Sequence, residues 1–523
     1  MAKALAAAVL VSIAWLAAGW APYLSVGTAA SPSGDYAYSL PSGDVLHYMA
    51  PSGSGGSDSN DGLAATVGGG HGPWLTPNHA LHCGDVIVAV TGTYSASGMG
   101  TFGAVSNCPS TTGGIDGTGG VWFAVIVCAG KLTTCDMTGT TNIAVNITSH
   151  NWAVEGFQVH NATGTAAFLN NGKPTATHHV AFINDIAYST PIGFGSGDDG
   201  TSHDVPGVSG FDYAAFVGTL AQNSEQNTVC TAATTMTGPN MLDTAAGTHI
   251  FIYGSFSYDI PDNGCRVGDM EDFMFDTFDA HGVTTTGVIL NNLGWGAASV
   301  GVNSFTQNFN SVAGLHVYIE NNTTYHDMEV ISGYLGELRI QNNNTAPEFE
   351  YIYNNVFLAT ASATNSCGIS AGASAGSNII VGATGKENVA WSTANSGWGI
   401  CYYSVATGVN FVTNPNFTNT ADLLANWVGV APNCSGYATT TACMGYDATT
   451  STLRTLTPIS DLTPTCTNCA GKGYQLPSVT CVTSGDIYNL YPTWLKGIVY
   501  LQWNSVSQTL TEKAGLVTKP CGL

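Results

Sequence analysis

The sequence predicts an all-β protein that folds as a parallel β-helix, a solenoid in which each coil of the chain stacks on the one before. Two observations predict this fold. The composition is rich in turn formers and poor in charge, with 64 Gly among 523 residues and 9% Asp, Glu, Lys and Arg. In addition, one short pattern recurs six times at a nearly constant spacing, which is typical of repeat architectures.

Each copy of the pattern reads as one strand followed by one turn. A copy begins with His, an aromatic residue or Thr, alternates apolar residues, and reaches Asn or Gly at its sixth position. Alternation buries one face of a strand, and Asn or Gly tolerates the left-handed backbone of a tight turn. Stacked coils would place the Asn side chains in a hydrogen-bonded ladder. The sixth positions, 34, 36, 37, 30 and 33 residues apart, are Asn184, Gly218, Gly254, Asn291, Asn321 and Asn354.

A β-propeller is the rival architecture with a similar period. A propeller blade needs about 40–50 residues and four hairpin-paired strands, with turn signals every few residues. The apolar runs of this chain are single and widely spaced, and no blade signature recurs. The sequence therefore favours the solenoid.

Residues 1–30 have the layout of a secretory signal peptide. One Lys precedes an apolar stretch over 4–21, and small residues follow up to Ala30. A retained membrane anchor is the alternative, because 4–21 is just long enough to span a bilayer. The Ala-rich composition favours cleavage after Ala30. The protein is thus expected to be secreted or held at the cell surface.

Fourteen Cys in an exported chain indicate disulfides rather than reduced thiols. The expected bridges within short loops join Cys128 to Cys135 and Cys434 to Cys443. The CTNC motif at 466–469 resembles half of a zinc site, but no second matching pair is present, so a disulfide is the preferred interpretation.

The charge balance excludes some partners. The formal net charge is −23, with only 11 Lys and Arg, so there is no basic patch to neutralise nucleic acid phosphates. Stable membrane association is not expected unless the N-terminal segment is retained. An acidic polymer as substrate would need a bridging cation.

Residues 47–94 carry a series of motifs in a fixed order: SDSNDG at 57–62, TPNHAL at 76–81, GDVI at 84–87 and GTY at 92–94. This order resembles the opening of right-handed parallel β-helix proteins of the pectate-lyase-like superfamily; the Gly-rich insertion at 68–72 departs from it. The matching residues are Ser57, Asp58, Asn60, Asp61, Gly62, Thr76, Pro77, Ala80, Leu81, Gly84, Asp85, Val86, Ile87, Gly92, Thr93 and Tyr94.

The resemblance implies a right-handed solenoid whose open end is covered by a short capping helix over 75–82. TNPNF at 413–417 resembles the segment that closes many such solenoids. From about residue 420 the composition becomes rich in Cys, Pro and Thr. We therefore expect a β-helix over 31–420 and a disulfide-rich C-terminal cap over 421–523, packed on the solenoid.

Carboxylates gather in the stretch GDMEDFMFDTFD at 268–279. Seven of the 34 Asp and Glu fall within 259–279, and such clusters need a cation, a proton or a base to compensate them. In a strand over 272–278, alternation places Asp272 and Asp276 opposite Phe273 and Phe275. We expect the two Phe to point into the core and the two Asp to project into a groove as the leading catalytic carboxylates.

Other polar residues near this stretch complete the expected site. Arg266 would act as the base or as a carboxylate clamp, or alternatively as a local ion pair for the neighbouring acids. The resemblance implies Ca²⁺ held by acids, and an acidic loop without function is the alternative. The expected Ca²⁺ ligands are Asp269, Glu271, Asp198 and Asp199, and the expected substrate-binding residues are His203, His281 and Trp295.

Three His share the first position of the repeat: His179, His249 and His316. A metal site is not expected, because Tyr213 and Thr286 occupy the same position in intervening coils. We expect stacked side chains instead.

Together these features predict an exported polysaccharide-active β-helix protein, a lyase or a glycoside hydrolase with an acidic groove. The alternative is a non-catalytic surface β-helix that binds glycans or builds an assembly, like an adhesin or a spike. A groove around the acids would favour the enzyme.

Overall fold

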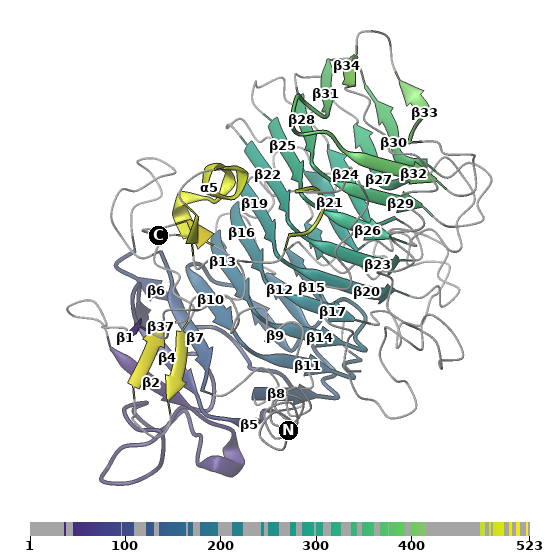
Figure 1. The fold of residues 1–523 in the computed structure, drawn as a ribbon. Coiled ribbons are helices and arrows are strands. Elements are labelled where there is room, and N and C mark those ends of the chain that lie inside the picture. The colour runs from purple at the N-terminus through teal and green to yellow at the C-terminus, as the bar shows by residue number, and fades with distance from the viewer. Residues whose placement is uncertain are drawn as a thin grey trace, which may run out of the picture.

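The computed structural model shows a parallel β-helix, as the repeat predicted. Its strands stack into three parallel sheets, and a typical coil contributes one strand to each (Figure 1). The structure describes residues 36–37, 45–95, 97–108, 122–129, 135–163, 166–170, 178–196, 212–222, 242–244, 249–260, 272–278, 285–297, 300–306, 315–325, 336–342, 348–359, 367–374, 376–392, 399–405, 407, 409–413, 471–475, 481–482, 485–495, 501–504, 509–512 and 519–520.

The first sheet contains the repeat strands predicted from the sequence. Its strands, in spatial order, are β2 (Leu46–Met49), β4 (Val86–Ala89), β7 (Ala124–Cys128), β10 (Trp152–Glu155), β13 (His178–Ile183), β16 (Asp212–Val217), β19 (His249–Tyr253), β22 (Thr285–Leu290), β25 (Leu315–Glu320), β28 (Glu348–Tyr353), β31 (Ser377–Val381) and β34 (Asn410–Thr413).

The second sheet follows the first after a two-residue turn in most coils. Its strands are β5 (Gly92–Thr93), β8 (Cys135–Thr138), β11 (Gln158–His160), β14 (Ile186–Tyr188), β17 (Leu220–Gln222), β20 (Phe256–Ile260), β23 (Leu293–Ala297), β26 (Thr323–Tyr325), β29 (Val356–Ala359) and β32 (Val389–Ser392).

The third sheet has two parts. One part contains β9 (Val145–Ile147), β12 (Phe168–Asn170), β15 (Phe194–Ser196) and β18 (Leu242–Thr244). The other contains β21 (Phe273–Phe278), β24 (Val302–Thr306), β27 (Gly336–Asn342), β30 (Cys367–Ala373) and β33 (Ile400–Val405).

The two-residue turns confirm one part of the repeat prediction and correct another. The residues at the sixth position are left-handed, with φ of 53° at Asn184 and 55° at Asn291, Asn321 and Asn354. The ladder, however, is formed by the next residue of each turn. Side-chain amides donate along it at 2.9, 3.0 and 2.9 Å, and its members are Asn292, Asn322, Asn355 and Asn388.

This one-residue shift has a physical cause. The left-handed residue turns its side chain away from the coil, and the following residue points inward, where no water can satisfy an amide. Asn322 and Asn355 are fully buried, and each also donates to a main-chain carbonyl at 2.8 Å. The ladder therefore satisfies buried polar groups that apolar side chains would leave without partners.

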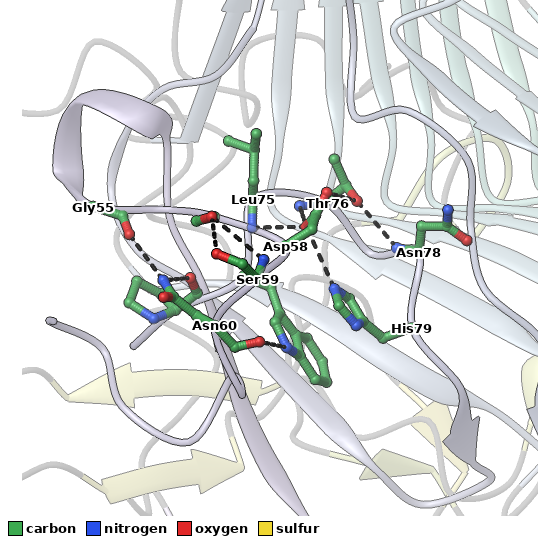
Figure 2. Close-up of polar contacts among 11 residues, drawn as sticks. Gly55, Asp58, Ser59, Asn60, Leu75, Thr76, Asn78 and His79 are labelled. Carbon is green, nitrogen blue, oxygen red and sulfur yellow. Dashed lines mark hydrogen bonds and ion pairs between the residues drawn. The ribbon is translucent and has the colours of Figure 1, made fainter. Parts of the chain in front are cut away.

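The expected capping helix over 75–82 is wrong. This segment forms bends and then β3 (Leu81–His82), which pairs with β6 (Val105–Ser106). The Asp58 carboxylate accepts hydrogen bonds from the amides of Leu75 at 3.0 Å and Thr76 at 2.8 Å, and from the Thr76 hydroxyl at 2.9 Å (Figure 2). These bonds hold the segment as a loop, and Pro77 contributes no amide to a helix.

The loop still protects the first strand. Trp74 exchanges two main-chain hydrogen bonds of 2.9 Å with Tyr48 and Ala50, next to β2. Its ring stacks between His47 and His79 at centroid distances of 4.4 and 4.0 Å. The loop thereby covers a sheet edge that would otherwise offer free backbone groups to another chain. A short 3₁₀ turn, η1 (Ser52–Ser54), follows β2.

The disulfide prediction is confirmed at Cys128–Cys135. Two further bridges join Cys83 to Cys108 and Cys367 to Cys401. Cys434, Cys443 and the motif at 466–469 lie outside the described residues, as do residues 1–35 and 421–470, so the predicted signal peptide and domain boundaries stay predictions.

Parts of the C-terminal region pack along the flank of the solenoid. We call 471–475 and 485–495 the strap; it includes α5 (Asp486–Leu490) and the 3₁₀ turn η3 (Thr493–Leu495), beside the middle of the first sheet (Figure 1). Further on, β36 (Leu501–Asn504) and β37 (Thr509–Glu512) form an antiparallel sheet with β1 (Tyr36–Ala37), and β35 (Cys481–Val482) pairs with β38 (Lys519–Pro520).

The strap covers an apolar outer face. Tyr491 and Trp494 are 7% and 3% exposed and lie in one cluster with outward side chains of the first sheet. Main-chain and side-chain hydrogen bonds also join the strap to the turns, because the Gln475 amide donates to Asn291 at 2.7 Å and Asn321 donates to the Gly471 carbonyl at 3.1 Å. The left-handed Asn residues thus dock the strap.

The prediction of stacked side chains is confirmed for all three His. Trp122, His179, Tyr213 and His249 form a continuous stack with centroid distances of 4.2, 4.2 and 4.3 Å, and Trp494 contacts it edge-on. His316 stacks on Phe349, its in-register neighbour on the next coil, at 5.1 Å. Burial lowers the pKa of His179 well below its usual value, which keeps the ring neutral.

Candidate functional site

The third sheet carries the acid-bearing strand β21, so the candidate site is built from its second part. Phe273 and Phe275 are fully buried in the main core, as predicted from alternation. Each pairs in register with β24, through Val302 and Ser304. Asp276 lies on β21 where the register with β24 shifts between Phe275 and Phe278.

Asp272 does not project into an open groove, and that part of the prediction is wrong. Its side chain is 0% exposed, and it accepts a short hydrogen bond from the Ser257 hydroxyl of β20. Ser257 pairs in register with Ala221 of β17, and Ala221 belongs to the main core. Asp272 lies immediately before β21, and its carboxyl group turns toward the second sheet.

Gly294 on β23 provides the space that Asp272 occupies. A Cβ atom at Gly294 would lie 2.8 Å from the carboxyl carbon of Asp272 and closer still to one of its oxygens. Ser257 and Gly294 pair directly across the second sheet. The carboxyl group is therefore held by Ser257 of its own coil and enclosed by Gly294 of the next coil, which makes Asp272 a structural or positioning group rather than an open catalytic acid.

The other predicted site residues are not brought together by the described structure. Trp295 lies on β23 in the second sheet, and only its backbone is described. The residues that lie outside the described part of the chain are Arg266, Asp269, Glu271, Asp198, Asp199, His203 and His281. Their expected roles in catalysis, Ca²⁺ binding and substrate binding remain predictions.

Arg339 is a residue that the sequence interpretation missed. It lies on β27 between Leu338 and Ile340, which both belong to the main core, so its side chain faces away from the core and is half-buried. In register it pairs with Asn303 on β24 and Ser370 on β30, both fully buried. Strict alternation in GELRIQN would have identified it.

Arg339 and Asp276 share a sheet. Strand β24 alone separates β21 from β27, so the two strands are roughly 10 Å apart across the sheet at ~4.8 Å per strand. The residue of β21 in the same row as Arg339 is Met274, and Asp276 follows it by two positions. A guanidinium stays charged and presents a fork of N–H donors that matches a carboxylate. The same sheet therefore carries a cation suited to anionic groups on β27 and Asp276 on β21.

Further carboxylates are buried inside the solenoid rather than on its surface. Glu348 and Glu350 on β28 are 0% exposed, and the Thr306 hydroxyl donates to Glu348 Oε1 at 2.5 Å. Burial raises the pKa of Glu348 to about 7, so it is protonated under mildly acidic conditions. Because these groups have no route to a polymer outside, we assign them no part in the site.

A third set of ionisable groups fastens the strap. Lys386 forms an ion pair with Asp486 of α5 and lies 3.7 Å from Glu320 Oε2 and 5.2 Å from the Tyr353 ring centre. Burial, followed by repulsion from Asp486, raises the pKa of Glu320 to about 8. These contacts join the strap to the coils of β25 and β28.

Within the described residues, no group of three or more His, Cys, Asp or Glu is placed to hold a metal ion. The expected Ca²⁺ ligands lie outside these residues, so the Ca²⁺ site stays a prediction. No helix in the same part of the chain is long and apolar enough to cross a membrane.

No family model and no curated protein matches the chain. Two solved structures are similar. The crystal structure of pectate lyase Pel9A matches with a TM-score of 0.37 and 14% identity, over 75% of this chain and 86% of that one. A rhamnogalacturonan lyase matches with a TM-score of 0.35 and 13% identity, over 74% of this chain and 92% of that one. At this level of similarity, activity does not transfer from either protein to this chain.

Proposed function

We propose that the protein is exported and acts on an acidic polysaccharide bound along the outer face of the third sheet. The observation that carries the proposal is Arg339, a half-buried cation on the same sheet as Asp276. In a chain of net charge −23, a cation at this position supplies the local positive charge that a uronic acid unit needs. Arg binds carboxylates bidentately, so Arg339 would position the sugar.

The chemistry proposed at this face is eliminative or hydrolytic cleavage. Asp276 and the neighbouring acids of 268–279 would exchange protons with the sugar, and the burial of Asp272 removes it from direct contact with substrate. Arg339 acts as a clamp rather than a base, because a guanidinium does not give up its proton at ordinary pH. Ca²⁺ held by Asp269 and Glu271 stays part of the proposal for acidic substrates.

The burial of Asp272 is also consistent with the alternative function, a β-helix that binds glycans without cleaving them. Hydrolysis by two carboxyl groups needs both near the scissile bond, about 5–10 Å apart, and one of the two predicted acids does not meet this condition. A β-helix that only binds glycans through Arg339 would retain affinity without turnover.

The test uses the purified mature protein and polygalacturonate, alginate and rhamnogalacturonan as probes, with and without Ca²⁺. Ultraviolet absorbance reports unsaturated products of elimination, and reducing-end release reports cleavage of either kind. We expect cleavage of at least one probe and a loss of about 10–100-fold in Arg339→Gln, the range expected for a charge-assisted hydrogen bond. Lys472→Gln, which removes a cation from the strap, is the matched control. Binding of a probe without cleavage would support the glycan-binding alternative, and neither binding nor cleavage would refute the proposal.

A further inference from the structure

The outer face of the first sheet changes character beyond the strap. From β7 to β22, Tyr491, Trp494 and Leu495 cover outward apolar side chains. Strands β28, β31 and β34 continue past α5 toward the end of the solenoid (Figure 1). Their outward side chains are half-buried or exposed, and Val412 is 42% exposed, one of few large apolar side chains so open in the described structure.

Two rows of outward side chains cross these strands in register. Phe349 on β28 pairs with Asn378 on β31, which pairs with Asn410 on β34. In the next row, Tyr351 pairs with Ile380, which pairs with Val412. The rings of Phe349 and Tyr351 thus lie beside smaller side chains on β31 and β34.

The rings of β28 form a wall. Tyr351 stacks on Tyr318 at 4.8 Å with an interplanar angle of 14°, and Phe349 stacks on His316 at 5.1 Å with an angle of 9°. One face of each β28 ring is therefore covered by β25. The opposite face looks toward β31, whose paired residues, Asn378 and Ile380, have smaller side chains than the rings.

The short side chains form a floor beside the wall. Asn410 is exposed and donates to Asn378 Oδ1 at 3.3 Å, while Asn378 donates to the Glu348 carbonyl at 3.1 Å. These hydrogen bonds orient the two amides, and Asn410 as a residue is exposed. Apolar contact is supplied by Ile380 and Val412.

We infer that this wall and floor, Phe349 and Tyr351 with Asn378, Ile380, Asn410 and Val412, bind a neutral polysaccharide chain. A sugar ring presents C–H groups to an aromatic face and hydroxyl groups at its edge, and the wall offers ring faces while the floor offers amides. The four floor residues carry no ionisable group, and the cation that lies near the wall in the described structure, Lys386, already pairs with Asp486 and Glu320. With a net charge of −23 for the chain, this face therefore disfavours anionic polymers.

This surface is distinct from the proposed active face, since it lies on the first sheet and Arg339 lies on the third. Its role is attachment: it holds the protein on a neutral matrix while the third sheet meets its own substrate. The inference does not depend on the proposed activity, because binding is measured without turnover.

The experiment is affinity gel electrophoresis of the full chain in gels that contain hydroxyethylcellulose, galactomannan or dextran. We expect retardation in at least one gel, and a loss of about tenfold in affinity when Tyr351 or Phe349 is changed to Ala, the scale on which aromatic stacking platforms act. Tyr48→Ala, which removes a half-buried Tyr from the same sheet at its other end, is the matched control. Melting temperature checks that each variant is folded.

The outcomes separate the alternatives. No retardation in any neutral gel, or retardation kept by the Phe349→Ala/Tyr351→Ala double variant, would overturn the inference. If this double variant instead changes the sedimentation of the free protein while no gel retards the wild type, the face pairs two copies of the chain and the inference is also overturned. Arg339→Gln is expected to keep full retardation, so failure of the proposed activity and failure of this surface give different results.

Discussion

The hydrogen bonds of the Asn ladder predict how much the free energy of unfolding falls when one ladder residue is replaced. In Asn355→Ala, the side chain loses four hydrogen bonds: it donates to Asn388 at 2.9 Å and to the Ile319 carbonyl at 2.8 Å, and it accepts from the Asn322 amide at 2.9 Å and its side chain at 3.0 Å. All of these groups are buried, so no water replaces the lost partners.

The magnitude comes from the groups left without partners. Two main-chain groups and two side-chain amides lose a partner, and each buried orphan costs about 1–3 kcal/mol. Because the two amides keep other partners, we expect Asn355→Ala to lower the free energy of unfolding by about 4 kcal/mol. Asn410→Ala, which breaks one exposed bond of 3.3 Å, should cost less than about 0.5 kcal/mol.

Urea denaturation followed by far-ultraviolet circular dichroism measures both variants against the wild type. A repeat protein can unfold coil by coil, so tryptophan fluorescence should be recorded as a second probe. If Asn355→Ala is no less stable than Asn410→Ala, the ladder does not stabilise the coils and the reasoning is refuted.

Three further predictions concern buried groups and the strap. Gly294→Ala should destabilise the fold by about 1–3 kcal/mol through overlap with Asp272, and thermal melting checks this; an unchanged melting temperature would show that the pocket is not tight. Because burial raises the pKa of Glu348 from 4.5 to about 7, the unfolded state loses its proton first, so stability should fall as pH rises from 4.5 to 7. In Glu348→Gln, the free energy of unfolding should no longer show the fall of about 3 kcal/mol that Glu348 causes by pH 7. If the free energy of unfolding depends on pH equally in the variant and the wild type, Glu348 does not have a raised pKa. Gly473→Ala should loosen the strap, because a Cβ there would lie 2.9 Å from Val356 at a left-handed backbone position; unaltered proteolysis of the C-terminal region would contradict that prediction.

The repeat could be predicted from the sequence because each coil imposes the same geometry on the same positions. Phe273 and Phe275 were placed correctly by alternation, and the left-handed turns at Asn291 and Asn321 followed from residue type. The disulfide between Cys128 and Cys135 followed from loop length. These are local properties, which the chain specifies within a few residues.

The failures involve contacts between distant segments. The loop over 75–82 is shaped by Asp58, seventeen residues before Leu75, and no helix signal reveals that competition. Asp272 turns inward because Gly294 on the next coil leaves room, which period and alternation do not show. The ladder was misplaced by one residue because the direction of a side chain at a left-handed position depends on backbone geometry.

Arg339 was missed for a different reason. Its position between two core residues is visible in the sequence, but the search for a base followed the acid cluster and selected Arg266. Alternation applied to every strand of the third sheet would have found it.

The most direct test of the central claim is the rate of product formation from acidic polysaccharides by the wild type and by Arg339→Gln. If the third sheet is the active face, the wild type cleaves at least one of polygalacturonate, alginate and rhamnogalacturonan, and the variant is about 10–100-fold slower at an unchanged melting temperature. Equal rates for the two proteins would contradict the account.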